Sequence, residues 1–116
     1  MKTAKITYKS NHAVADRCKI AESALSRMIG LLNRKNLQEG EGLLIVPCKQ
    51  VHTLFMQFAI DAIFLTRDNE IIDIAELRPW RVSRFYFKAH KVLETPLGTA
   101  KKLGLAPGDR LELSIC

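Results

Sequence analysis

The feature that most constrains this chain is an apolar run from Val51 to Leu65, which is interrupted by His52 and Asp61. A run this apolar is typical of a segment that is buried on both faces. A carboxylate in such a place costs free energy unless it is hydrogen-bonded, paired with a cation or protonated. We therefore expect Asp61 to have a partner, and any functional site to lie near this segment.

The length of 116 residues suffices for one domain with its own core and is too short for two, so we expect a single domain over residues 1–116. No apolar stretch reaches the roughly 20 residues that cross a membrane. Residues 1–10 are polar and lack the apolar core of a signal peptide, and the three cysteines show no CxxC spacing. These features predict a cytoplasmic protein with free thiols and no membrane partner.

Alternation of apolar and polar residues predicts that most of the chain is extended. Two β-branched runs flank Arg67–Glu70, where Asp and Asn tolerate the left-handed conformation that tight hairpins require. A second hairpin is predicted at the N-terminus, and a turn at Ala106–Asp109 precedes the last strand. The extended segments cover residues 3–9, 14–20, 43–46, 60–66, 71–77, 85–89, 92–94 and 111–115.

Two short helices interrupt this pattern. The first follows a capping serine at Ser23 and carries an apolar stripe at i, i+3, i+4 and i+7 over Leu25–Leu32. The second begins at Thr95-Pro96 and ends at Leu103, before a left-handed Gly104. Because the strands follow one another like hairpins, we predict a mainly β (α+β) fold: a compact antiparallel β-barrel or sandwich of about seven strands with two short helices.

The chain resembles a prokaryotic family known as domain of unknown function 192 (DUF192). The matching pieces are Arg27–Leu32, Val51-His52-Thr53 with Met56 and Phe58, Ile60-Asp61, Phe64-Leu65, Val92–Glu94 with Gly98, and Gly108-Asp109. They occur in the expected order over nearly the whole chain. The resemblance implies a mainly β, barrel-like or sandwich domain with short helices, and it supplies no activity, cofactor or catalytic residue.

Asp61 and Glu94 have the most apolar sequence surroundings of the acidic residues. Two carboxylates that face one cavity would bind a cation or divide acid and base roles, because desolvation and repulsion separate their pKa values. Our leading hypothesis is thus a pocket for a small ligand or partner, lined by His52, Thr53, Asp61 and Glu94, with Cys48 nearby. The structural alternative is that Asp61 holds loop N–H groups or an arginine, while Glu94 merely precedes a helix.

An enzymatic alternative is a hydrolase or transferase that uses Cys48 or these carboxylates, since a thiolate beside an imidazole such as His52 is a common nucleophile. The same pair, joined by His90 or Cys116, resembles a zinc ligand set, but Cys-x3-His without a second close pair is a weak signal. We therefore predict no metal site and no cofactor, and we expect a monomer.

A third hypothesis concerns basic and aromatic residues that alternate after the second hairpin, a mixture that holds phosphates and stacks bases. The residues are Arg78, Trp80, Arg81, Arg84 and Lys88, with Phe85, Tyr86 and Phe87 among them. The formal net charge of +6 agrees with an anionic partner, although it is also a common route to solubility. Nucleic-acid binding is therefore a possible but not the favoured function from the sequence.

Overall fold

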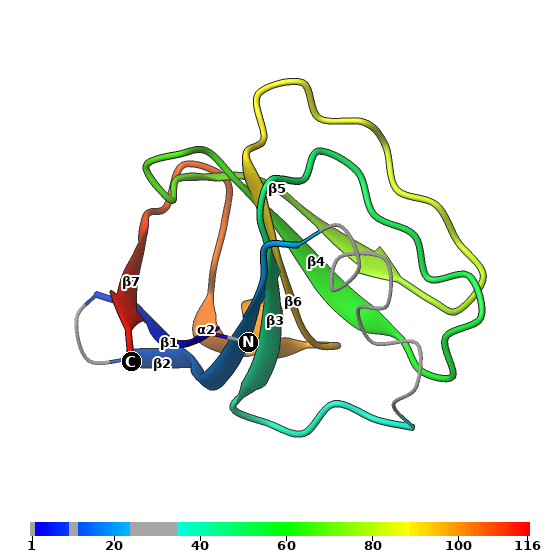
Figure 1. Cartoon of the computed structure of the whole chain (residues 1–116), viewed down its shortest axis with the longest axis horizontal. Helices are drawn as coiled ribbons and strands as arrows, with labels where there is room; N and C mark the ends of the chain where they lie inside the picture. The colour runs from blue at the N-terminus through cyan, green and yellow to red at the C-terminus, as the bar shows by residue number, and fades with distance from the viewer. Residues whose placement is uncertain (1, 10–11, 24–34) are drawn as a thin grey trace.

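The computed structural model describes residues 2–9, 12–23 and 35–116, and these form one seven-stranded sheet with a short helix (Figure 1). The elements in chain order are β1 (Lys2–Tyr8), β2 (His12–Ala21), β3 (Glu41–Ile45), β4 (Ile60–Leu65), β5 (Ile71–Leu77), β6 (Lys91–Pro96), α2 (Thr99–Leu103) and β7 (Leu111–Ile115). The strand order across the sheet is β5-β4-β6-β3-β2-β1-β7. The predicted mainly β class is confirmed.

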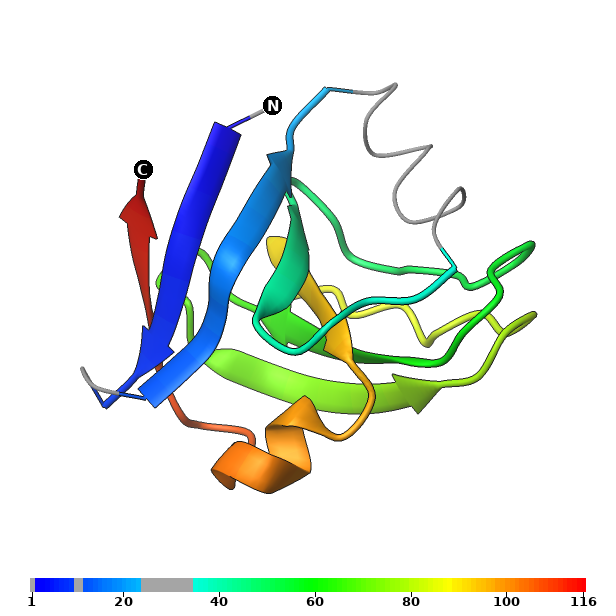
Figure 2. The same cartoon turned by 90° about the horizontal axis from the view of Figure 1, so that it is seen from below.

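The sheet curls into a half-barrel, whose two edge strands meet at one end (Figure 2). An isolated bridge joins Glu70, just before β5, to Arg110, just before β7. Ile71 N–H donates to Asp109 C=O at 2.7 Å, and Leu111 N–H donates to Asn69 C=O at 2.9 Å. The hairpin turn after β4 therefore ties the two ends of the sheet together.

Both predicted hairpins are confirmed. β1 pairs with β2 and β4 pairs with β5, each in antiparallel register. Asn69 adopts a left-handed φ of 67° in the second turn, as its side chain type predicts. The turn before β7 is also as predicted, with Asp109 N–H donating to Ala106 C=O at 3.1 Å.

The sheet is mixed rather than purely antiparallel, because β2 and β3 run parallel. A parallel pair needs a connection of about a dozen residues or more, so that the chain can return to the same end of the sheet. Residues 22–40 supply that length between the two strands. The prediction of an entirely antiparallel arrangement is wrong at this one pair.

The second predicted helix ends where expected but begins later. Thr95 and Pro96 belong to β6, where Thr95 pairs with Asp61 of β4. The helix α2 starts only at Thr99, after Gly98 has turned the chain with a φ of 94°. Leu105 N–H then donates to Ala100 C=O at 2.9 Å, which closes the helix as the sequence indicates. Burial of Thr95 in the sheet outweighs its preference for capping a helix.

Two other predicted elements are absent from the described strands and helices. The extended segment predicted at 85–89 is wrong, since those residues form part of a loop between β5 and β6. The first predicted helix, after Ser23, lies outside the described residues from position 24 to position 34. In the described ranges, no helix is both long and apolar enough to pass through a membrane.

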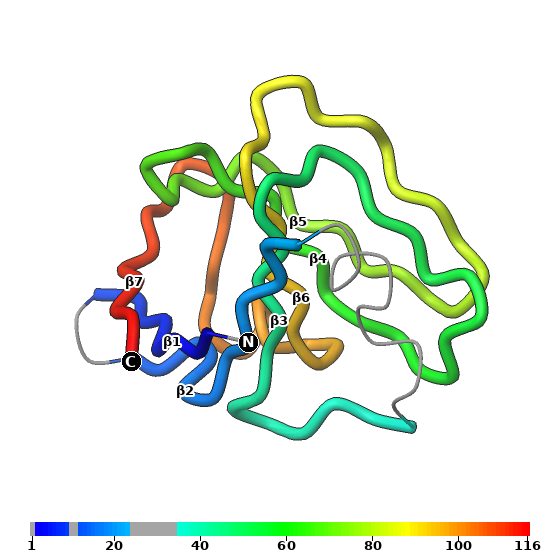
Figure 3. The backbone as a smooth tube through the Cα atoms, viewed as in Figure 1, coloured from blue at the N-terminus to red at the C-terminus, as the bar shows by residue number. Residues whose placement is uncertain are grey.

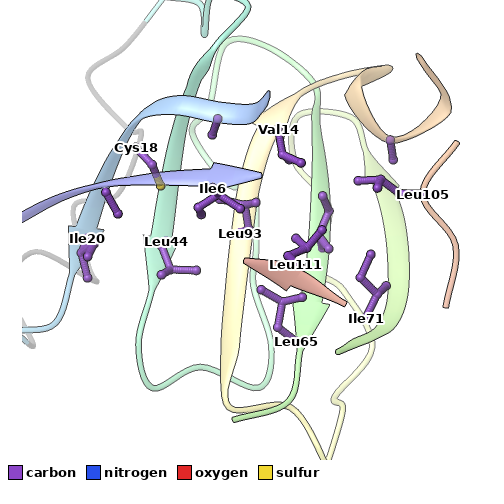
Figure 4. Close-up of a cluster of buried hydrophobic side chains, with 14 residues drawn as sticks. Ile6, Val14, Cys18, Ile20, Leu44, Leu65, Ile71, Leu93, Leu105 and Leu111 are labelled. Atoms are coloured by element: carbon purple, nitrogen blue, oxygen red, sulfur yellow. The ribbon is translucent and has the colours of Figure 1, made fainter. Parts of the chain in front are cut away.

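Buried side chains form two clusters on opposite faces of the sheet. The first gathers Ile6, Ile63, Leu65, Leu93 and Leu111, among others, and α2 contributes Ala100 (Figure 4). The second lies on the other face of β3, β4 and β6 and includes Leu43, Ala62, Phe64 and Val92. The loops at 46–59 and 78–90 cover this second cluster, because Val51, Met56 and Ala89 pack into it.

Candidate functional site

The loops at 46–59 and 78–90 lie side by side as an irregular antiparallel ribbon, here called the loop ribbon (Figures 1 and 3). The backbone contacts that join the loops are Thr53 N–H to Arg81 C=O at 2.8 Å, Ser83 N–H to Val51 C=O at 2.8 Å, Tyr86 N–H to Lys49 C=O at 2.8 Å, and a bridge between His52 and Val82. Val51, Thr53 and Ser83 are buried. The exposed outer side carries His52 and Val82.

Thr53 fixes one end of the loop ribbon. Its side chain is buried, and its hydroxyl donates to Arg78 C=O at 2.5 Å and accepts from Arg81 N–H at 2.9 Å. The Thr53 carbonyl accepts from Trp80 N–H at 2.9 Å. A residue predicted to contact a ligand is therefore engaged in holding the turn at 78–81.

The other end of the loop ribbon is attached to the sheet through Tyr86. Its ring packs on Phe64 of β4 with centroids 4.2 Å apart, and its hydroxyl donates to Asp73 Oδ2 of β5 at 2.5 Å. Burial and the neighbouring Asp73 carboxylate raise the pKa of Tyr86. The Lys49 ammonium adds bonds to the carbonyls of Phe87 and Ala89, both at 2.7 Å. Both ends of the loop ribbon are thus held in place.

Large apolar side chains are concentrated on the exposed surface of the loop ribbon. Among the described residues, seven large hydrophobic side chains are exposed, and five of them lie here: Phe55, Trp80, Val82, Phe85 and Phe87. The most exposed is Phe87, at 80%. Scattered apolar residues are normal on a surface, whereas larger exposed apolar groups are typical of interaction sites.

The same loops carry cations and no carboxylate. Positions 46–59 and 78–90 contain five lysines and arginines, Lys49, Arg78, Arg81, Arg84 and Lys88, but no Asp or Glu. In the part of the chain that the structure describes, Arg78, Arg81, Arg84 and Lys88 form no ion pair. These four side chains are exposed. Most of the formal net charge of +6 is therefore located on one surface.

All five residues predicted for nucleic-acid contact lie on the loop ribbon. They are Arg78, Trp80, Arg81, Arg84 and Lys88. The sequence did not predict that Phe55 joins them, because it lies in a run that looked buried throughout. Its ring contacts Trp80, with centroids 4.6 Å apart. Both segments lack acidic residues, and this shared feature of the sequence could have indicated that they belong to one surface.

The residues of the predicted pocket do not come together. His52 is exposed on the loop ribbon, and its Nδ1 accepts from Leu54 N–H at 3.2 Å. Cys48, in the same loop, donates its thiol hydrogen to Gln50 C=O at 3.1 Å. Within residues 2–9, 12–23 and 35–116 there is no group of three His, Cys, Asp or Glu residues that would hold a metal ion.

Asp61 is 1% exposed and points to the face of the sheet on which α2 packs. Its Oδ2 accepts from Gly98 N–H at 3.2 Å and from Ala100 N–H at 3.0 Å. Burial raises the pKa of Asp61, although these two N–H groups act in the opposite direction. The expectation that this carboxylate needs a partner is confirmed for Oδ2, whose partners are backbone groups at the start of α2. Its Oδ1 is buried and has no hydrogen-bond partner among the described residues.

Glu94 lies on the opposite face. It pairs with Ala62 in β4, while Asp61 pairs with its neighbour Thr95, and consecutive strand residues point to opposite sides. Glu94 is 3% exposed. Burial raises the pKa of Glu94 to about 8. The sheet therefore separates the two carboxylates that a shared pocket would require.

A hollow of about 190 Å³ lies elsewhere, between the start of β2, Glu39-Gly40 and α2. The charged groups on its wall already have partners: Lys102 contacts Glu39, and Asp16 lies 3.7 Å from the neighbouring Arg17 guanidinium. It contains none of the residues predicted for a ligand site. Its chemistry indicates no particular ligand.

The sequence profile of the DUF192 family, described as an uncharacterized ACR family, matches residues 5–113. The chain belongs to this family. Its DUF192 relatives include a UPF0127 protein of Pyrococcus furiosus, 34% identical over 99 residues, which is 81% of this chain and 84% of the relative. A UPF0127 protein of Pyrococcus abyssi is 32% identical over 102 residues, covering 83% and 85% of the two chains.

Two crystal structures share the DUF192 fold seen here. A protein of unknown function from Novosphingobium aromaticivorans superposes with a TM-score of 0.80 at 25% identity, over 95% of this chain and 83% of that chain. A proposed transcription regulator from Sinorhizobium meliloti gives a TM-score of 0.79 at 25% identity, over 97% and 92%. The function of the family is unknown, so the site must be interpreted from its own chemistry.

Proposed function

We propose that this protein is a small nucleic-acid-binding module and that the loop ribbon is its contact surface. The observation that carries the proposal is the combination of five cations, no carboxylate and five exposed apolar side chains on two adjacent loops. Cations contact phosphates, and exposed aromatic rings stack with bases. The description of the Sinorhizobium meliloti neighbour as a proposed transcription regulator is in keeping with this function.

The anchoring of the loop ribbon supports a binding role. Ordering long loops on binding costs conformational entropy, and a surface that is already held avoids that cost. Here the buried Thr53 hydroxyl holds the turn at 78–81, and Tyr86 attaches the other end to β4 and β5. The cations are thereby presented on a prearranged surface.

A shared carboxylate pocket is less well supported. Asp61 already accepts two backbone hydrogen bonds, and Glu94 lies on the other side of the sheet. Thr53 uses its hydroxyl within the loop ribbon. We therefore infer a binding function and assign no reaction to these residues.

We further infer that the protein acts as a monomer in the cytoplasm. The loop ribbon supplies cations and rings from a single chain, so that one copy carries a complete contact surface. Light scattering is expected to give a mass near the 13.1 kDa of one chain. A mass of twice that value would contradict the monomer.

The proposal is tested by the salt dependence of binding to a labelled single strand, measured by fluorescence anisotropy between about 50 and 200 mM salt. For a single strand, each phosphate contact contributes a slope of about −0.7 in log affinity against log salt. The double variant Arg81→Gln/Arg84→Gln is therefore expected to reduce the slope by about 1.4.

The matched control is Lys5→Gln/Lys19→Gln, which removes the same charge from exposed positions on β1 and β2. We expect this control to leave the slope unchanged. An equal reduction of the salt slope in both double variants would indicate attraction by net charge alone. Binding whose affinity does not change with salt would contradict the proposal.

A further inference from the structure

Phe55 and Trp80 form an exposed pair of rings that bridges the two loops. The ring centroids are 4.6 Å apart and the planes are inclined by 59°. Phe55 is 68% exposed and Trp80 is 55% exposed, so most of each side chain faces solvent although the rings touch. Planar rings of this size, held in fixed positions with open surface, suit the stacking of a third flat ring.

Both residues of the pair have a backbone conformation that their side chains disfavour. Phe55 has a φ of 66° and Trp80 a φ of 65°, in the left-handed region that bulky L-residues seldom occupy. Thr53 holds both positions, because its carbonyl accepts from Trp80 N–H at 2.9 Å and from Met56 N–H at 3.1 Å. Such conformations persist only where the surroundings impose them, and they cluster at functional sites.

Two cations flank the ring pair. Arg78 and Arg81 lie on either side of Pro79-Trp80 in the chain and are exposed. The Arg81 guanidinium donates to the backbone carbonyl of Trp80 at 3.3 Å. In the described ranges neither arginine has a carboxylate partner. Flat rings beside unpaired cations match the bases and phosphates of a nucleotide strand.

We propose that the Phe55–Trp80 pair is a stacking site for the unpaired bases of a single-stranded nucleic acid, with Arg78 and Arg81 on the adjoining phosphates. This inference rests on the proposed function and narrows its ligand from nucleic acid in general to strands with accessible base faces. In a duplex the base faces are occupied by their neighbours, so they are not available to these rings. The charge of the loop ribbon favours this occupant over an uncharged apolar partner.

The test compares three ligands of equal length against the unmodified protein: an oligothymidylate of about 12 nucleotides, an abasic strand and a duplex. Stacking predicts that the oligothymidylate binds about 10-fold more tightly than the abasic strand, since one stacked base is worth roughly 5- to 150-fold in affinity. Phe55→Ala and Trp80→Ala are expected to remove most of this difference and leave the abasic affinity unchanged.

Ile115→Ala is the matched control, because it removes an equally exposed apolar side chain, 59% accessible, from the distant strand β7. The comparison of ligands on the unmodified protein does not depend on the folding of any variant. Equal, salt-sensitive affinity for all three ligands would overturn the stacking site and leave the proposed function intact. If the protein bound none of the three ligands in a salt-sensitive way and bound vesicles of phosphatidylglycerol instead, both the stacking site and the proposed function would be overturned.

Discussion

The centre of the sheet and the loop ribbon both depart from the usual distribution of side chains, in opposite directions. At the centre of the sheet, Asp61 and Glu94 are carboxylates in apolar surroundings. On the loop ribbon, rings such as Phe87 and Trp80 are exposed to water. Buried charge and exposed apolar groups are the two placements that call for an explanation.

The buried carboxylates of the sheet and the exposed groups of the loop ribbon differ in how the rest of the chain compensates them. Two backbone N–H groups bind Asp61, and burial raises the pKa of Glu94 to about 8, so that it is mainly uncharged at neutral pH. The fold therefore compensates both carboxylates in part, although Asp61 Oδ1 is buried without a hydrogen-bond partner among the described residues. On the loop ribbon, by contrast, Arg78, Arg81, Arg84 and Lys88 form no ion pair with the described residues, and the function that we propose supplies their partner from outside the chain.

The largest expected effect concerns Glu94 and pH. Its pKa rises from a usual value of 4.5 to about 8 on folding. Above pH 4.5 the unfolded chain loses this proton first, so the free energy of unfolding falls as pH rises and levels off near pH 8. The expected slope is about 1.4 kcal/mol per pH unit.

Glu94→Gln keeps the shape of the side chain and cannot ionise. Urea unfolding at a series of pH values is expected to show a flatter profile for this variant than for the unmodified protein. Taking the difference between the two profiles removes the contributions of other groups, including Asp61, whose pKa is raised as well. Parallel profiles would mean that Glu94 is ionised in the folded protein.

The next effect in size is expected for Asp61→Ala. This change leaves the N–H groups of Gly98 and Ala100 without their acceptor at the start of α2. The free energy of unfolding should fall by about 2–3 kcal/mol, which is typical for hydrogen bonds to a charged group. The control is Asp61→Asn, which retains an acceptor oxygen. We expect the free energy of unfolding to fall less in this variant. Equal losses in both variants would show that the charge, not the hydrogen bonds, matters.

A smaller effect links the two regions, because Thr53 is buried but acts on the loop ribbon. Thr53→Val keeps the volume and removes the hydroxyl that bonds to Arg78 C=O and Arg81 N–H. We expect a loss of about 1–2 kcal/mol in stability, together with weaker binding of single strands. Thr3→Val, the same substitution at an exposed position on β1, serves as a control for both measurements. Normal binding by a destabilised Thr53→Val would show that the turn at 78–81 is not needed.

The smallest effect on stability is expected for substitutions of the exposed rings of the loop ribbon. Phe85 and Phe87 are exposed, so Phe85→Ser and Phe87→Ser should change the free energy of unfolding by no more than about 0.5 kcal/mol. Thermal unfolding provides the measurement. A loss comparable with that of Asp61→Ala would mean that these rings support the fold, and the contrast between the two regions would disappear.

Local patterns in the sequence predicted what is local in the structure. The alternation of apolar residues located both hairpins, and Gly104 marked the end of α2. The late start of α2 was missed because Thr95 is held by its pairing with Asp61, which is distant in the chain. The parallel pairing of β2 with β3 depends in the same way on a long connection.

The contact surface that we propose could be anticipated from the sequence only in part, for the same reason. Arg78, Trp80, Arg81, Arg84 and Lys88 stand out in the sequence because they follow one another in one segment. Phe55 was missed, since its contact with Trp80 joins two separate loops. The separation of Asp61 from Glu94 depends on the register of β4 against β6, and no pattern within either strand specifies that register.

The most direct test of nucleic-acid binding by the loop ribbon uses the fluorescence of Trp80, which is the single tryptophan of the chain. Unlabelled oligothymidylate is titrated into the protein at low salt while the tryptophan emission is followed. Because Trp80 is exposed and placed to stack with a base, we expect saturable quenching that added salt reverses. Emission that stays constant while the strand binds elsewhere, or no binding at all, would contradict the proposal.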